Sequence, residues 1–299
     1  MNKNSRSRVV DILLLALMIL PFVAAILLKV LFKPVGEGIS ITGAYVYFTI
    51  PMPLMDLPIS ESQVNSVAVV LSLLGLCLYL TRGLKVKPDS KRQIAAEYIV
   101  EKTNNLILDN MGPRFMAFAP FVAGIMGISA FSSLSSLLGL FPPTSDMNIV
   151  AGWAILVFIL ITHYKLKGGV GPYVKGFFEP VPIFAPFNII GEFATPVSMS
   201  FRHYGNVLSG VVIATLVGSA LGNLTNMLLG WLPGFLGEIP FLQVGIPAIL
   251  SMYFDIFSGV MQAFIFAMLT MLYIATGFPE EEYERRKAKR NAKKALPTA

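Results

Sequence analysis

The chain has 299 residues, of which 55% are hydrophobic and only 13% are charged, whereas a soluble domain carries roughly a quarter charged residues. This deficit, with apolar runs of about 20 residues, excludes a soluble globular protein and predicts an all-α integral membrane protein. The formal net charge of +6 lies mostly in short basic stretches beside the apolar runs, so it indicates flanks of membrane spans and excludes a nucleic-acid partner.

Six segments are predicted to cross the membrane as helices. In chain order they are Val9–Phe32, Val64–Leu80, Phe115–Leu140, Ile149–His163, Phe184–Leu221 and Phe241–Ala275. The last two exceed the roughly 20 residues that a crossing needs, so we expect them to form a long, tilted or bent antiparallel pair. Pro196 can kink the fifth span about two turns before Arg202.

The first segment has two interpretations. Positive charge precedes it, as in a signal peptide, but its apolar stretch is longer than a usual signal-peptide core, and no clear A-x-A site follows. The sequence therefore favours a retained helix at residues 9–32 and leaves cleavage open.

The loops predict the orientation, because cytoplasmic loops are enriched in Lys and Arg. Basic residues precede the first span and recur in Thr81–Arg114, at Lys165, Lys167 and Lys175, and in the tail, whereas the intervening loops carry one lysine at most. Both termini are thus predicted to be cytoplasmic. Ser90–Asn110 has apolar residues near helical spacing among charges, which favours an amphipathic helix on the inner surface over an ordinary connector helix.

Ionisable residues inside a span are rare and mark functional sites. The candidates are Glu192 and Arg202 in the fifth span and Asp255 in the sixth. A guanidinium cannot lose its proton in the bilayer, so Arg202 needs a polar or anionic partner. We expect a carboxylate on another subunit; a structural pair within the chain is the alternative.

Spacing places these residues on two polar stripes. One contains Ser198, Arg202 and Asn206 at intervals of four, and the other contains Asp255, Ser258 and Gln262 at intervals of three and four. Single Ser or Asn residues often only pack helices together, but stripes that also carry Arg and Asp favour a site.

The depths of the charged residues suggest two access paths. Glu192 lies ten residues before Arg202, or about 15 Å toward the inner side. Asp255 would be an outer acid, Arg202 a central fixed cation and Glu192 an inner acid. This order suits two offset aqueous paths that do not meet. Glu192 fits an interfacial carboxylate equally well.

Four motifs carry a family resemblance. Gly191–Gly210 (GEFATPVSMSFRHYGNVLSG) resembles the fifth-span signature of F-type ATP synthase subunit a, and Gln262–Thr270 (QAFIFAMLT) resembles its last-span signature. Pro142–Asn148 (PPTSDMN) is similar to its outer-loop motif, and Lys91–Glu97 (KRQIAAE) to its inner amphipathic helix. They occur in the family's order over most of residues 58–276. The resemblance divides the chain into an extra span and outer loop (1–57), the membrane domain (58–276) and a basic cytoplasmic tail (277–299).

The resemblance implies an ion-translocating stator subunit of the F0 sector in a bacterial inner membrane. Its partners would be c-ring subunits, the b-subunit stalk, the rest of F1F0 and membrane lipid. Arg202 would face the rotor, with Asn206 and Gln262 as polar companions. Asp255 would serve the outer half-channel, and Asp146 and Asn148 would lie near its mouth.

No catalytic residues, metal site or cofactor are expected. No G-x-x-x-x-G-K-[ST] sequence occurs, so nucleotide chemistry is assigned to partner subunits. The transported ion is expected to be H⁺, with Na⁺ left open, as are the c-ring stoichiometry and the preferred direction of ATP turnover. The competing class is an independent secondary ion transporter with an intramembrane Arg–carboxylate site, but the internal repeat typical of such proteins is not found.

Three departures from the family pattern matter. His203 and Tyr204 stand where Leu-Phe is usual, which places a titratable ring beside Arg202; we expect His203 to point toward another helix, with local pH dependence left open. Val211 stands where many relatives carry Glu or His. The segment 9–32 has no counterpart in the shorter members.

Overall fold

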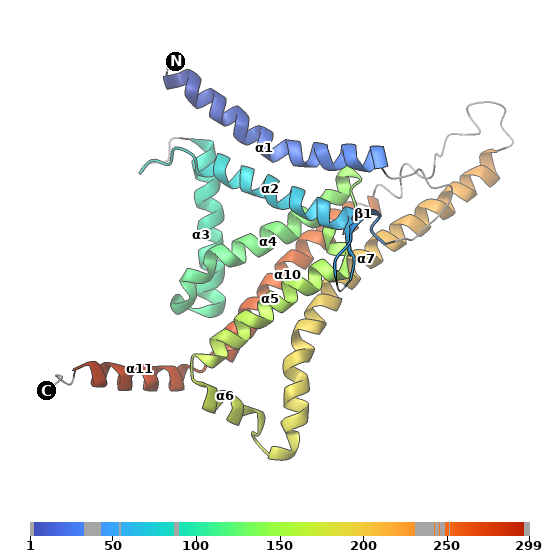
Figure 1. Ribbon diagram of the computed structural model, residues 1–299. Helices are drawn as coiled ribbons and strands as arrows, with labels where there is room; N and C mark the ends of the chain where they lie inside the picture. Colours follow the sequence, from blue (N-terminus) through green and yellow to red (C-terminus); the bar gives the residue numbers. More distant parts are fainter. Residues whose placement is uncertain are drawn as a thin grey trace.

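The computed structural model describes residues 3–32, 43–53, 55–86, 90–230, 242, 245, 249–250 and 252–295. Helices make up almost all of it (Figure 1). The helices are α1 (Lys3–Phe32), α2 (Glu61–Thr81), α3 (Lys91–Met111), α4 (Ala119–Leu134), α5 (Met147–Leu166), α6 (Val170–Phe177), α7 (Ala185–Leu229), α10 (Gly259–Gly277) and α11 (Glu280–Ala295). Short 3₁₀ turns are η1 (Pro113–Phe118), η2 (Ser135–Leu138), η3 (Pro143–Ser145) and η4 (Pro182–Phe184), and η5 (Met252–Ser258) is π-helical.

Among the residues that the structure describes, six helical stretches are long and apolar enough to cross a membrane, which confirms the predicted number. They are Val9–Phe32, Glu61–Thr81, Pro113–Leu138, Met147–Leu166, Pro182–Leu229 and Met252–Gly277. The fifth runs to Leu229 rather than Leu221, because its last turns remain apolar. The predicted start of the sixth at Phe241 lies outside the described residues.

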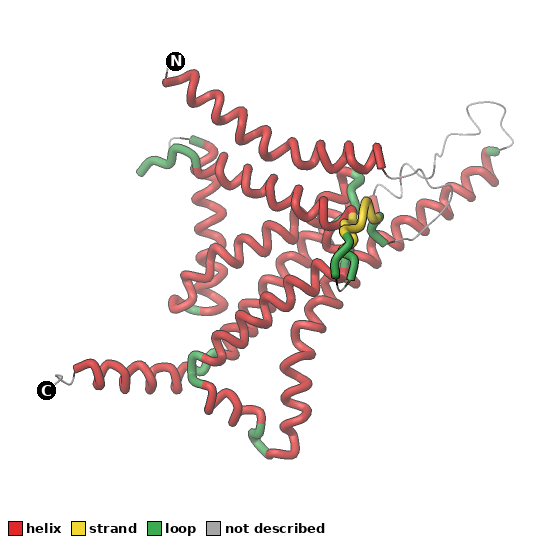
Figure 2. The backbone as a smooth tube through the Cα atoms, in the orientation of Figure 1, coloured by secondary structure: helices red, strands yellow, loops and turns green. Residues whose placement is uncertain are grey.

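A small hairpin, which the sequence analysis did not predict, precedes α2. Strands β1 (Val46–Ile50) and β2 (Leu57–Ser60) pair antiparallel, with Ile50 opposite Leu57 (Figure 2). The hairpin leads directly into α2, whose start carries a capping box between Ser60 and Gln63.

The packed core lies where α4, α5, α7 and α10 meet. It contains Val122 and Ile125 of α4, Val157 and Ile161 of α5, Met199 of α7, and Phe266, Met271 and Ile274 of α10. Aromatic side chains close the end of this core: Phe115 lies 5.6 Å from Tyr164 and 5.5 Å from Phe278, centroid to centroid. This four-helix contact is the scaffold that fixes the orientation of α7.

Helix α7 continues through Pro196 and is bent rather than straight (Figure 1). Proline removes one backbone hydrogen bond from a helix. The Ser200 hydroxyl donates to the Pro196 carbonyl over 2.7 Å, a back-bond that often accompanies helix bending. The early part of α7 can therefore follow a different direction from the later part.

Helix α3 crosses the ends of α2 and α4 instead of running beside them (Figure 1). Ser90 caps it by accepting the Gln93 N–H. Ile107 is buried, whereas Ile94 and Ile99 are about half exposed. Because the described chain leaves these apolar side chains uncovered, α3 fits a helix that lies on a membrane surface better than a connector covered by protein.

Helix α1 is packed closely against α2. A Cβ atom built on Gly75 would lie 2.9 Å from the Met18 backbone nitrogen, so the two backbones touch. At one end Asp11 of α1 accepts from Arg82 at 2.9 Å and from Arg92 at 3.2 Å. At the other end Lys29 lies 3.8 Å from the buried carboxylate of Glu61.

We predict that Gly75→Ala destabilises the subunit by roughly 1–3 kcal/mol, because the added methyl group forces α1 and α2 apart. The measurement is the thermal midpoint of the purified complex in detergent. Gly152→Ala, in α5, is the matched control, since a Cβ there meets nothing within 4 Å. Equal midpoints for the two variants would contradict the close contact.

Candidate functional site

The two predicted polar stripes meet at Asn206. Its Nδ2 donates to Gln262 Oε1 at 3.1 Å, and the Ser258 hydroxyl donates to Asn206 Oδ1 at 3.4 Å. Gln262 is buried. Gly210 of α7 allows this approach, because a Cβ there would lie 3.0 Å from Phe254 of η5; a Cβ on Gly259 would lie 2.6 Å from Ser133, so α10 also lies close to α4. The amide pair therefore joins α7 to α10 across a close helix contact.

Arg202 lies one turn before Asn206 and is exposed on the surface of the isolated chain, as is Ser198 one turn earlier. Within the described part of the chain, its guanidinium forms no hydrogen bond or ion pair. The structure does not bring Arg202 together with Glu192 or Asp255. A cation that stays charged at membrane depth is thus presented to whatever lies outside this helix face.

His203 points the other way, into the bundle. It is fully buried, with Nε2 3.3 Å from the Ser129 hydroxyl of α4. Its ring lies edge-on to Trp153 of α5 at 5.9 Å and Phe266 of α10 at 5.4 Å. The expected direction toward other helices is confirmed, and the imidazole is one of the contacts that fix the rotation of α7.

Asp255 lies on the π-helical segment η5 and is half-buried. The α-helical spacing assumed for Asp255 and Ser258 is therefore wrong, because a π turn closes i to i+5 hydrogen bonds and shifts the faces. The Ser136 side chain, at the end of the α4 span, lies near Asp255, and its hydroxyl donates to the Ser133 carbonyl at 2.7 Å. Ser258 and Gln262 nevertheless reach the same Asn206 amide.

Asp146 is held at the start of α5. It accepts the backbone N–H of Asn148 at 3.0 Å, a helix-capping contact, and also the hydroxyl of Ser62 at the start of α2. Asn148 itself is exposed. The motif Pro142–Asn148 thus caps α5 and ties it to α2, a structural role that sequence reasoning did not assign.

Glu192 forms a close ion pair with Lys165, whose Nζ lies 2.7 and 2.9 Å from the two carboxylate oxygens. The Tyr173 hydroxyl donates to Glu192 Oε1 at 3.4 Å. Burial and the neighbouring Glu192 charge raise the pKa of Tyr173 above its usual value of 10.

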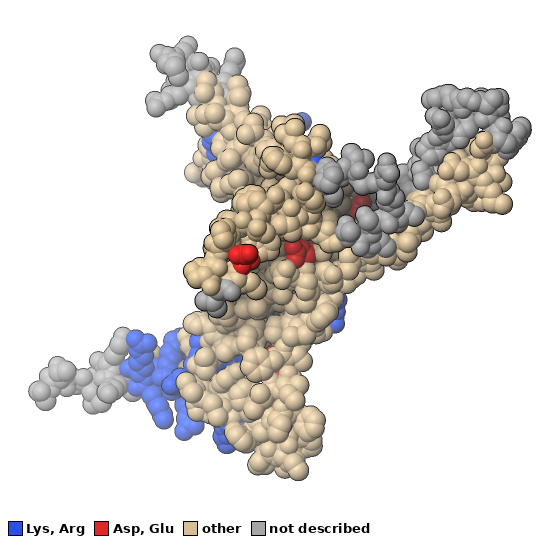
Figure 3. Space-filling model, turned by 45° about the vertical axis from the view of Figure 1, so that its right-hand side comes forward, with Lys and Arg blue, Asp and Glu red and all other residues tan. Residues whose placement is uncertain are grey.

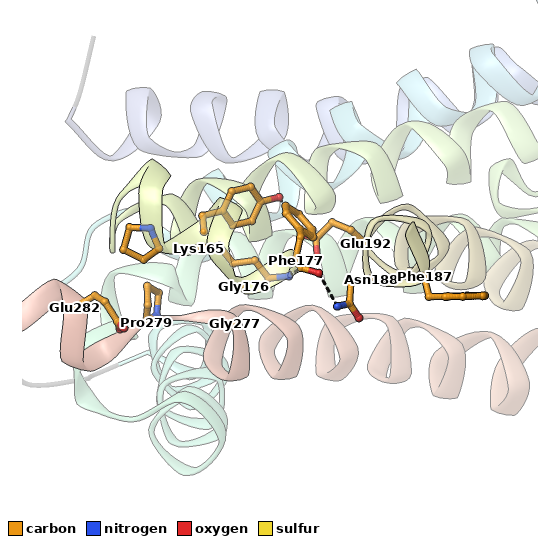
Figure 4. A pocket seen from close by; sticks show the side chains of 12 residues that line it. Lys165, Gly176, Phe177, Phe187, Asn188, Glu192, Gly277, Pro279 and Glu282 are labelled. Atoms are coloured by element: carbon orange, nitrogen blue, oxygen red, sulfur yellow. Dashed lines mark hydrogen bonds and ion pairs between the residues drawn. The ribbon is translucent and has the colours of Figure 1, made fainter. Parts of the chain in front are cut away.

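Two cavities adjoin this ion pair. The larger, of about 470 Å³, is lined by Lys165, Tyr173, Asn188, Glu192 and Glu282 among others (Figure 4). The second, of about 330 Å³, continues along Glu192, Thr195 and Thr276. Both have room for several water molecules. Glu192 therefore lies at a polar opening on the end of the bundle that carries α6 and α11.

A polar cluster at the opposite end was not predicted. Glu61 accepts the Phe141 N–H at 3.3 Å, and Asn65 donates to the Phe141 carbonyl at 2.8 Å. The α4 span adds a group of buried serines: Ser129, Ser132, Ser133 and Ser135. The four-residue spacing of Glu61 and Asn65, together with the serine-rich stretch at 129–136, is a signal that could have revealed this cluster. Within the described residues, no three His, Cys, Asp or Glu side chains gather as a metal site would require.

Comparison with known proteins supports the motif-based resemblance. Residues 64–275 match the ATP synthase A chain family. The chain is 33% identical over 236 residues to ATP synthase subunit a of Bacillus pumilus, covering 75% of this chain and 93% of that protein. It is 32% identical over 230 residues to ATP synthase subunit a of Desulforamulus reducens, covering 74% and 81%. It is also 38% identical over 143 residues to the sodium-ion-specific ATP synthase subunit a of Propionigenium modestum, covering 47% and 42%.

The matched range contains Arg202, Asn206, Asp255 and Gln262, and leaves α1 outside. The match extends over most of the chain and over nearly the whole length of the first relative. The chain belongs to the ATP synthase A chain family.

Proposed function

We propose that the chain is the ion-translocating stator subunit of a bacterial F-type ATP synthase membrane sector. The observation that carries the proposal is Arg202, a guanidinium on an outward face of α7. It lies beside a hydrogen-bonded joint to α10 and has no partner within the described chain. The facing partner is a carboxylate of the c-ring, and the b-subunit stalk and F1 complete the assembly.

The outer path leads past Asp146 and Asp255 to the ring. A proton that arrives there neutralises a ring carboxylate, which can then rotate into lipid. An ionised carboxylate would stay behind, because moving it from water into hydrocarbon costs many kcal/mol. The serines around Asp255 and Ser133 supply hydroxyl groups along this route.

The inner path is the pair of cavities at Glu192. After a near-complete turn, the ring site meets this opening and releases its proton toward Glu192 and Lys165. Arg202 stabilises the emptied, anionic site and repels cations that would pass directly from one path to the other. Each elementary charge that crosses 100 mV supplies about 2.3 kcal/mol, so several ions must pass for each ATP.

We assign H⁺ as the transported ion, with Na⁺ as the alternative that one relative's name raises for that protein. Nucleotide chemistry belongs to partner subunits. The positive charge of the segment before the first span, of the second and fourth loops (Thr81–Arg114 and Lys165–Lys175) and of the tail supports cytoplasmic termini in the bacterial inner membrane.

Arg202→Ala is expected to lower ATP-driven ion pumping by more than about tenfold in vesicles that contain the whole complex. A charge contact at low dielectric is worth more than the roughly 1.4 kcal/mol that a tenfold change represents. Arg285→Ala, which removes the same group from exposed α11, serves as the control. Normal pumping by an assembled Arg202→Ala complex would contradict the stator role and favour an independent transporter.

Asn206→Leu should leave buried Gln262 unpaired and lower the free energy of unfolding by about 1–3 kcal/mol. Replacing both residues by leucine removes both polar groups, so stability should largely return. Pumping should remain low in the double variant if the amides serve the ion path. Recovery of pumping together with stability would assign the pair to packing alone.

The inner cavities should admit water-soluble reagents. Cys77 is the single cysteine of the chain, so Cys77→Ser gives a background without thiols. In it we expect Thr195→Cys to react readily with a small cationic thiol reagent, because Thr195 lines the second cavity. Val197→Cys is the control, since this exposed α7 position lines neither cavity. Equal labelling rates at the two positions would argue against an aqueous inner path.

A further inference from the structure

A cationic pocket of about 400 Å³ lies where α5 meets α11. It is lined by Lys167, Tyr283, Arg286, Lys287 and Arg290. Lys167 follows the last residue of the α5 span, and α11 begins just after the α10 span ends at Gly277. The pocket therefore adjoins the ends of two membrane spans.

The pocket depends on a tight turn that lets α11 approach. Gly169 has a φ of +115°, which side chains other than glycine rarely adopt. A Cβ there would lie 2.8 Å from Arg286 Cζ, so the guanidinium rests directly against the backbone of the turn. At Gly168 a Cβ would collide with Pro279. These contacts hold the cations of α11 next to Lys167.

Two other basic residues at this end, Arg114 and Lys165, are neutralised by acidic residues of the chain. Arg114 pairs with Glu284 at 2.5 Å and Glu280 at 3.4 Å, and Lys165 pairs with Glu192 at 2.7 Å. By contrast, none of the four pocket cations forms an ion pair in the part of the chain that the structure describes. None of the described residues that line the pocket is acidic.

The surface of the molecule shows the same separation of charge. Basic side chains gather at the end that carries α11, whereas the span surface beside them is nearly free of charge (Figure 3). Lys167 Nζ lies 4.0 Å from the centre of the Tyr164 ring, at the edge of the aromatic cluster that closes the core. Aromatic and basic residues together are typical of the level of lipid headgroups.

We propose that this pocket binds the phosphate of an anionic phospholipid headgroup. Headgroups occupy a layer roughly 5–8 Å thick beyond each side of the hydrocarbon core, and residues that directly follow two spans lie in that layer. Arginine forms paired hydrogen bonds with phosphate oxygens, and basic clusters beside a span attract anionic lipid. The inference concerns the lipid boundary and does not depend on the proposed ion path.

The test uses the whole complex in phosphatidylcholine vesicles that contain a minor fraction of phosphatidylglycerol with a photoactivatable headgroup. Crosslinked lipid on α11 peptides is measured by mass spectrometry. We expect Arg286→Gln with Arg290→Gln to lower crosslinking by about tenfold. The matched control is Arg285→Gln with Lys289→Gln, which removes the same charge at the same spacing from residues outside the pocket.

An equal loss of crosslinking in the two double variants would overturn the proposed site. Lipid binding would then be due to the overall charge of the tail. Equal crosslinking of a phosphatidylcholine probe, or full displacement by millimolar inorganic phosphate, would also overturn it, the latter in favour of a soluble anion. Gly169→Val gives a second measurement that keeps every charge. It should displace Arg286 and lower crosslinking as well, and unchanged crosslinking would contradict the geometry.

Discussion

A guanidinium inside a bilayer keeps its charge, and the arrangement of α7 follows from that constraint. Arg202 occupies an exposed face, while the adjacent His203 is buried among α4, α5 and α10. Asn206, one turn away, is tied to Gln262. One side of the helix thus supplies the contacts that hold it, and the other presents the charge. Without those buried contacts, rotation of α7 would carry Arg202 toward the apolar core.

The three candidate acids have contacts of their own and do not pair with Arg202. Glu192 is paired with Lys165, Asp146 caps α5, and Asp255 lies near Ser136. Glu192 lies on α7, Asp146 at the start of α5 and Asp255 on η5. A carboxylate that approaches Arg202 from outside therefore meets little competition from within the subunit, which suits a contact that must form and break repeatedly.

Much of this arrangement could be predicted from sequence because hydropathy and helical spacing are local. Apolar length gave six spans, and intervals of three and four residues led to Arg202, Asn206 and Gln262. Contacts between distant segments left no comparable signal. The ion pairs of Asp11 with Arg82 and of Lys29 with Glu61 join residues far apart in the chain, and the spacing of the residues around Asp255 does not reveal the π turn. The roles of the site residues and the division at residues 57 and 276 stay predictions.

The ion pairs at the two ends of α1, at Asp11 and at Lys29, also fix the length that the α1–α2 pair presents to the membrane. Asp11 and Lys29 are 18 positions apart, or roughly 27 Å along a helix, close to the roughly 30 Å of a hydrocarbon core. Sliding α1 by one turn, about 5.4 Å, would break both ion pairs at once. The pair α1–α2 therefore has a fixed hydrophobic length, and a thicker or thinner bilayer must be met by tilting both helices together.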